Sequence, residues 1–241
     1  MNKKKKITIF AAVTAIVLAL CLSIGGVSAY LTATPTGGNS LENTFIARSG
    51  LLQDASTFKL TETKTIISLD GNSYVAAKDV GEGNYEIAGV GDEVAITTTG
   101  NTYSDLIAGM TLLKDPVVEF GTTTSTTYLF VKVVESNIPV GVLDYDYNTE
   151  KFEDITEAVK TAGGTVAAGT KIFVYKTANN NIIDKGATVE ESIIDGNEVR
   201  VLDSNDLASM TNAKIIFSAY LTQTAGFASA AEAFVGCGYA E

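Results

Sequence analysis

The feature that most constrains the fold is a succession of short segments rich in Val, Ile, Thr, Phe and Tyr, separated by turns. Those residue types favour strands, and clusters such as Asp70-Gly71-Asn72 and Asp195-Gly196-Asn197 favour the turns between them. The expected strands are 57–69, 92–98, 126–134, 140–147, 170–177 and 214–222. Many short strands at such spacing predict an all-β chain, folded as an antiparallel β-sandwich of the jelly-roll type.

Two segments have helical patterns, 154–160 and 229–235, each about two turns long. Neither could organise a core by itself, so we expect one or two short helices beside the sandwich. The sequence shows no fixed-period repeat and no low-complexity linker. This predicts a single folded domain over residues 48–241.

The N-terminus has the organisation of a secretory signal peptide. Lysines at 3–6 precede an uncharged apolar run over 7–24, and small residues follow, with Val27 and Ala29 at the −3 and −1 positions before Tyr30. We therefore expect a helical signal peptide over 1–29 and a mature chain that is secreted to the extracellular matrix or the cell surface. The apolar run is long for a signal peptide, so a retained membrane anchor stays open, and membrane contact is expected only through this segment.

The chain contains no histidine and has a net charge of −11. Without imidazole, neither Ser-His-Asp and Cys-His catalytic groups nor His-ligated metal sites can be built. The acidic balance argues against nucleic acid as a partner, because phosphate binding requires a surplus of Lys and Arg. We therefore expect no enzymatic activity, no cofactor and no metal site.

Ser56 and Lys59 have the S-x-x-K spacing of serine β-lactamases and penicillin-binding proteins. That chemistry needs both side chains on one face of a helix. The segment that follows alternates like a strand, which would place Ser56 and Lys59 on opposite faces. We therefore interpret the segment as a strand.

The segment 144–150 carries acidic or amide residues at every second position, which is typical of calcium loops: Asp144, Asp146, Asn148 and Glu150. The Gly and Glu that an EF-hand requires at its sixth and twelfth positions are missing. The same spacing is explained by a strand with a solvated acidic face and with Tyr145 and Tyr147 on the other. Weak calcium binding at 144–150 stays open.

Cysteine usage gives little information on assembly. Cys21 lies within the apolar run, so Cys237 is the single cysteine of the expected mature chain. One cysteine cannot form an internal disulfide. We expect a free thiol near the C-terminus, and a bridge between subunits stays open.

Several blocks of sequence occur in an order that has a known counterpart. The signal exit continues into Ala29-Tyr30-Leu31-Thr32, Asn43-Thr44-Phe45 follows, and later blocks lie at 113–118, 128–133 and 216–234. Together these resemble the TasA/camelysin family, exported proteins of Gram-positive bacteria whose signal peptides are processed by a SipW-type signal peptidase. The chain departs from the family pattern at Ala33, where an acidic residue is usual, and after Ala47, where glycine is expected.

The resemblance implies a subunit of extracellular fibres in a biofilm matrix that assembles by donor-strand complementation. The expected partners are other copies of this chain, joined head to tail as a homopolymer, and the SipW-type signal peptidase. Segment 30–47 would form the N-terminal arm and donor strand, and its alternation places on one face Leu41, Asn43, Phe45 and Ala47. A head-to-tail edge contact does not close, so it propagates as a filament.

Two other functions stay open. The donor segment could pair within its own subunit, which would leave a monomeric cell-surface module. Such a module could bind glycans, with Tyr145 and Tyr147 as the obvious aromatic pair. The family name also implies a peptidase, because camelysin is classed as a metallopeptidase. We disfavour a peptidase, since the chain has neither an H-E-x-x-H motif nor any histidine.

Overall fold

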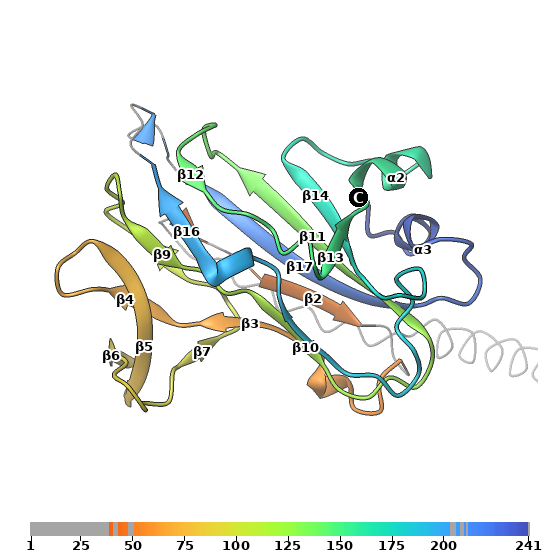
Figure 1. Cartoon of the computed structure of the whole chain (residues 1–241), viewed down its shortest axis with the longest axis horizontal. Helices are drawn as coiled ribbons and strands as arrows, with labels where there is room; N and C mark the ends of the chain where they lie inside the picture. The colour runs from red at the N-terminus through yellow and green to blue at the C-terminus, as the bar shows by residue number, and fades with distance from the viewer. Residues whose placement is uncertain are drawn as a thin grey trace, which may run out of the picture.

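The computed structural model describes residues 39–40, 43–47, 51–202, 206–207, 210 and 212–240. Within them most of the ordered structure is β-strand, so the predicted all-β class is confirmed (Figure 1). The expected cleavage-site residues Val27, Ala29 and Tyr30 lie outside the described residues, as does Leu41 of the expected donor strand. No helix in the described ranges is both long enough and apolar enough to span a membrane.

A five-stranded sheet forms the centre of the molecule. Its strand order is β13-β14-β11-β17-β2, and every neighbouring pair is antiparallel except β17 and β2, which are parallel. The strands are β13 (Phe152–Asp154), β14 (Thr170–Tyr175), β11 (Thr127–Ser136), β17 (Lys214–Gln223) and β2 (Asn43–Ala47). The long pairing of β11 with β17 makes these two strands the core of the sheet.

Further sheets lie beside and across from the central one. A four-stranded sheet contains β15 (Val189–Ser192), β10 (Val117–Phe120), β3 (Lys59–Thr63) and β7 (Ile96–Thr97). A six-stranded sheet contains β12 (Leu143–Asp144), β16 (Glu198–Val201), β9 (Thr111–Leu113), β5 (Ser73–Gly81), β4 (Thr65–Ile67) and β6 (Asn84–Ile87). A small pair joins β1 (Asn39–Ser40) to β8 (Thr102–Tyr103).

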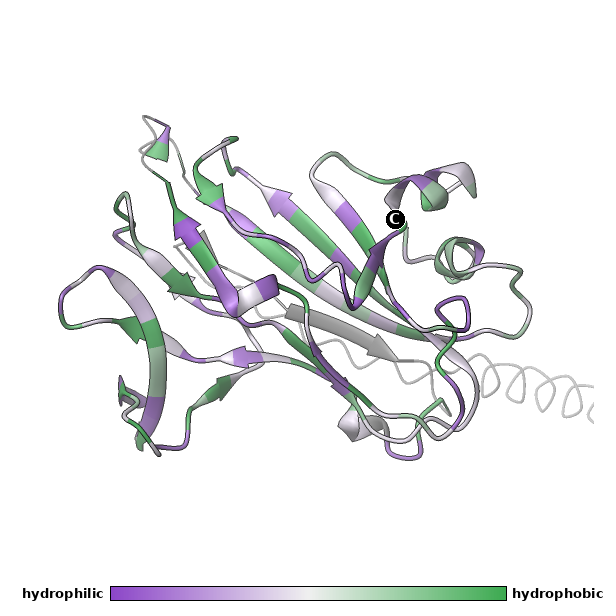
Figure 2. Cartoon of the chain, in the orientation of Figure 1, coloured by the Kyte–Doolittle hydropathy of each residue, from purple (hydrophilic) through white to green (hydrophobic). Residues whose placement is uncertain are grey.

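The main hydrophobic core lies between the central sheet and the strands of the two neighbouring sheets. Alternate residues of the central strands point into it, including Leu129, Val131 and Val133 of β11 and Phe217 of β17. Phe58 and Leu60 close the core from the opposite layer, as expected when two sheets pack face to face. Figure 2 shows the hydrophobic stretches of the central strands in the interior of the molecule.

The opposite face of the central sheet is covered by two short helices, α2 (Thr156–Thr161) and α3 (Ala230–Gly236). Phe130 of β11 and Tyr220 of β17 point to this side and contact Phe234 of α3, with ring centroids 5.2 and 5.8 Å apart. The Ser229 side chain accepts a hydrogen bond from the Glu232 N–H and caps α3. Both helices lie where the sequence predicts them.

Several expected strands are shorter in the structure. Only 96–97 of the expected strand 92–98 and 143–144 of the expected strand 140–147 form strands, and Tyr147 adds an isolated bridge to Ile194. The expected strand 57–69 is interrupted at Lys64, whose N–H bonds to Ala95 while its carbonyl bonds to Ala77. Half-exposed strands of mixed composition, such as β5 and β6, do not stand out in the sequence.

Candidate functional site

The candidate site is the edge of the central sheet at which β2 lies. β2 pairs with β17 over five residue pairs, from Asn43 opposite Phe217 to Ala47 opposite Leu221. In the part of the chain that the structure describes, β2 pairs with no other strand, so it is the edge strand of this sheet. Figure 1 shows β2 alongside β17, with β3 nearby.

The register relates the expected donor residues to the main core. Asn43, Phe45 and Ala47 lie opposite Phe217, Ala219 and Leu221, and these three residues of β17 are fully buried in the main core. Paired residues of parallel strands lie on the same face of a sheet. Asn43, Phe45 and Ala47 therefore occupy register positions opposite residues of the core face of β17.

β17 depends on β2 for part of its main-chain hydrogen bonding. β11 covers one edge of β17 along its whole length, and β2 covers the other edge from Phe217 to Leu221. Without β2, this stretch of a strongly buried strand would present unpaired N–H and C=O groups. This edge of β17 can therefore pair with one extended segment in parallel orientation.

A second polar feature, buried between the sheets, is not predicted by the sequence. Glu62 and Lys114 are fully buried and their side chains form an ion pair. The Asn101 N–H donates to Glu62 Oε1 over 3.1 Å, and the Asn101 carboxamide bonds to the main chain of Thr63 and Thr65. Charged residues in a strand pattern are normally taken for its solvated face, so only the folded register identifies this pair.

The surroundings of this pair shift its protonation equilibria. Burial lowers the pKa of Lys114, and attraction to Glu62 opposes that effect. Burial, together with the charge of Glu62, raises the pKa of Tyr103 well above its ordinary value. Both side chains are buried, and the loss of hydration of the charged form is the main cause of each shift.

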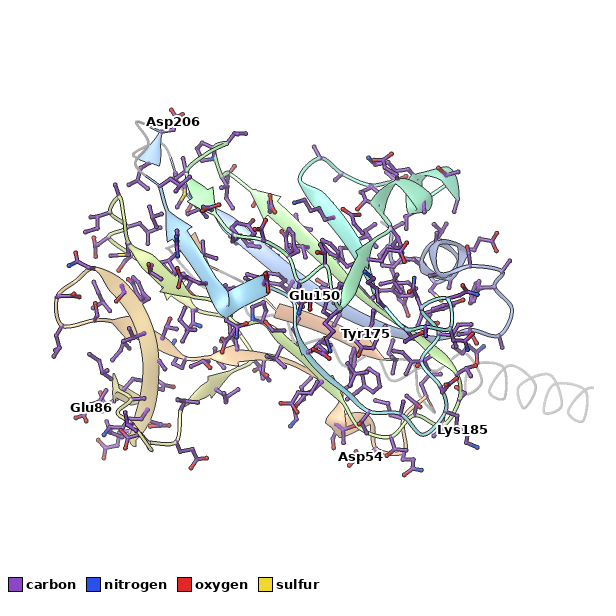
Figure 3. All side chains as sticks on the ribbon, viewed as in Figure 1. Asp54, Glu86, Glu150, Tyr175, Lys185 and Asp206 are labelled. Atoms are coloured by element: carbon purple, nitrogen blue, oxygen red, sulfur yellow. The ribbon has the colours of Figure 1, made fainter. Side chains whose placement is uncertain are left out.

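The S-x-x-K segment does not place its serine beside its lysine. Ser56 lies in the 3-10 turn Ala55–Thr57, so the strand expected there is wrong at this residue. The Ser56 hydroxyl donates to Asp54 Oδ1 over 2.7 Å, and Lys59 pairs with Glu119 at 3.1 Å. Figure 3 shows Asp54 at the margin of the molecule. These partners account for both side chains without catalysis.

The segment 144–150 turns its tyrosines inward. The hydroxyl groups of Tyr145 and Tyr147 both donate to Glu135 Oε1, Tyr145 over 2.8 Å and Tyr147 over 2.5 Å. Both rings pack against the main core. Burial and the neighbouring Glu135 carboxylate raise the pKa of both phenols. Neither ring is presented as a flat platform for a ligand.

The described residues contain no group of three or more Cys, Asp and Glu side chains close enough to hold a metal ion. Glu150 lies in the turn after Tyr147 and is exposed (Figure 3). Cys237 is a free, half-buried thiol whose Sγ atom lies 3.2 Å from the Thr222 hydroxyl.

No family model, no curated protein and no solved structure matches this chain. Among the described residues, the β2 edge is the feature with the clearest capacity for interaction.

Proposed function

We propose that this protein is a secreted structural subunit of extracellular biofilm-matrix fibres, which polymerises when the N-terminal strand of one copy pairs with β17 of the next. The observation that carries the proposal is the position of β2, an edge strand close to the N-terminus whose single partner, within the described residues, is β17. In the proposed fibre the same β2 residues occupy the same register, but they come from a neighbouring copy.

Exchange of this strand is inexpensive in free energy. A segment at a sheet edge and near a chain terminus can leave its own subunit and enter another while every pairing is reproduced. A closed monomer and an exchanged polymer then differ mainly in linker strain and in the entropy of association. Because each copy gives one strand and receives one, the contact is head-to-tail and propagates.

The proposal also includes the processing of the signal peptide, the jelly-roll topology and the family setting that the sequence predicts. The signal peptide is removed after Ala29 by a SipW-type signal peptidase, which frees the arm 30–47, and the sandwich has jelly-roll topology. Facing sheets whose strands are mostly antiparallel support that topology. The likeness of several sequence blocks to the TasA/camelysin family supports the biological setting.

A disulfide between β2 and β17 tests which copy supplies the strand. Thr44 lies opposite Ser218, so the pair Thr44→Cys and Ser218→Cys, in a Cys237→Ser background, should oxidise readily. In the proposed fibre the bond joins different copies, and a non-reducing denaturing gel shows a ladder of oligomers. A single band of cross-linked monomer under assembly conditions would contradict the proposal.

The matched control shifts one cysteine by a single residue. Phe45→Cys with Ser218→Cys places the two thiols on opposite faces of the sheet, because successive residues of a strand alternate. This variant should give no ladder. Electron microscopy provides the second readout: we expect filaments from residues 30–241 and none from a chain that starts at Arg48.

A further inference from the structure

The buried pair of Glu62 and Lys114 carries an inference that does not depend on fibre assembly. Glu62 follows Leu60 on the core-facing side of β3, and Lys114 lies directly after β9, two residues beyond the core residue Leu112. Both charges thus occupy positions that normally hold apolar side chains. The Lys114 ammonium lies 5.2 Å from the centre of the Phe217 ring.

An ion pair in such a place contributes little to stability, because the loss of hydration of the two charges offsets their attraction. The fully buried surroundings lower the pKa of Lys114, which makes the neutral amine accessible. An amine and a carboxyl group held in contact in a dry site react as if they were extremely concentrated.

We propose that Lys114 and Glu62 form an intramolecular isopeptide bond. The Lys114 Nζ atom attacks Glu62 Cδ, the N–C bond forms, and the bond from Cδ to Oε2 breaks. One proton passes from the ammonium group to Oε2 before the attack, which frees the nitrogen lone pair. A second proton passes from Nζ to Oε2 after the attack, and Oε2 leaves as water. The charges of the pair cancel, no oxidation state changes, and no co-reactant is needed.

The two carboxylate oxygens of Glu62 have different hydrogen-bond partners, and each partner suits the role of its oxygen in this step. Oε2 contacts Lys114 Nζ, whereas Oε1 accepts the Asn101 N–H over 3.1 Å. That N–H stabilises the negative charge that develops on Oε1 in the tetrahedral intermediate and then bonds to the amide carbonyl. A cavity of about 30 Å³, lined in part by Lys114 and Tyr103, gives the departing water a place to go.

The other side-chain acyl groups nearby, those of Asn101 and Asp115, are hydrogen-bonded to Thr63 and Thr65 and not to Lys114. Asn101 Nδ2 donates to the Thr63 carbonyl over 2.7 Å, and Asn101 Oδ1 accepts the Thr65 N–H over 3.0 Å. The Asp115 carboxylate accepts both the N–H and the hydroxyl of Thr63. Glu62 is therefore the electrophile that the geometry selects.

Tryptic digestion of the denatured full chain, followed by mass spectrometry, tests the bond directly. We expect a branched product in which peptide 60–64 is attached to peptide 79–132, uncleaved at Lys114 and lighter than the sum of the two by one water. Separate linear peptides 60–64 and 79–114 would overturn the proposal. A loss of ammonia within 79–132 would also overturn it, because Asn101 would then be the electrophile.

Two controls make the result specific. Lys114→Arg keeps the positive charge but removes the nucleophilic amine, so peptide 60–64 should be released. The solvent-accessible pair of Lys59 and Glu119, 3.1 Å apart on the neighbouring strands β3 and β10, provides an internal control in the native chain. No cross-link should form there, since water reaches and solvates both groups. A cross-link at both pairs would show that proximity alone is responsible and would overturn the role of the buried site.

Discussion

The Lys132 ammonium group on β11 donates a hydrogen bond to the main-chain carbonyl of Tyr239, 3.2 Å away. Residue 132 lies near the middle of the central strand and residue 239 lies at the C-terminal end of the described chain. The bond therefore holds the segment after α3 against the sheet, on the side that Phe234 and Tyr220 also occupy.

Lys132→Met should lower the free energy of unfolding by about 1 kcal/mol, because the carbonyl loses a charged donor while the aliphatic stem is retained. Burial lowers the pKa of Lys132, because the ammonium group loses hydration in the folded chain. This loss of hydration offsets part of the stability that the hydrogen bond contributes. Urea unfolding measures the change. Lys176→Met, which removes an exposed bond of 2.9 Å to the Thr149 carbonyl, should change stability by less than about 0.5 kcal/mol. Equal losses would contradict this assignment.

The tyrosine pair on Glu135 predicts a loss of stability in alkaline solution. The pKa values of Tyr145 and Tyr147 are raised above the ordinary value of 10.0, so the folded chain holds their protons where the unfolded chain releases them. Their stabilising effect is complete below about pH 10 and is lost as the pH rises further, by up to about 1.4 kcal/mol per pH unit for each group. Urea unfolding of the double variant Tyr145→Phe, Tyr147→Phe should show a weaker dependence of the free energy of unfolding on pH between about pH 10 and pH 11.5. Parallel slopes for the two proteins would refute the prediction.

Phe234 anchors α3 to the sheet. Its side chain is fully buried against the rings of Phe130, Tyr220 and Tyr239. Phe234→Ala should cost about 3 to 5 kcal/mol and should raise the labelling rate of the Cys237 thiol, since the helix then docks loosely. Val235→Ala, at the half-exposed neighbouring position, should cost about 1 kcal/mol and leave labelling unchanged. Rapid labelling in both variants would show that the Phe234 contacts are not what protects the Cys237 thiol.

Gly169 is required for two reasons that can be separated by experiment. Its φ is +74°, and a Cβ atom there would collide with the main-chain oxygen of Glu135. Gly186 has a φ of +89° but open space around it. Gly186→Ala should therefore cost about 1 kcal/mol, whereas Gly169→Ala should cost about 3 kcal/mol in thermal or urea unfolding. Similar losses would show that the contact with Glu135 relaxes freely.

The parts of the fold that the sequence predicts are those with a strong local pattern. β11, β14 and β17 are recognisable because long apolar runs are needed where both faces of a strand are buried. The expected strand 140–147 illustrates the limit of this argument. Tyr145 and Tyr147 alternate as in a strand, but only Leu143 and Asp144 form one. Tyr147 makes an isolated bridge to Ile194, and the hydroxyls of both tyrosines donate to Glu135.

The same limit applies to the candidate site. The alternation in 41–47 predicts a strand, and β2 confirms one over Asn43–Ala47. Its parallel partner β17 lies near the other end of the chain, where no local pattern can identify it. The Glu62 and Lys114 pair is harder still, since charged residues indicate a solvated surface until tertiary register places them inside.

The parallel register of β2 and β17 has a mechanical consequence in the proposed fibre. Tension along such a fibre pulls β2 along its own axis, so it loads the five residue pairs from Asn43 to Ala47 in shear. Main-chain hydrogen bonds that run across the strands then yield together instead of opening one after another, as they do when a hairpin is peeled from its end. A joint built in this way resists stretching far better than peeling, and a matrix made of such fibres would tolerate flow along its filaments better than forces that bend them apart.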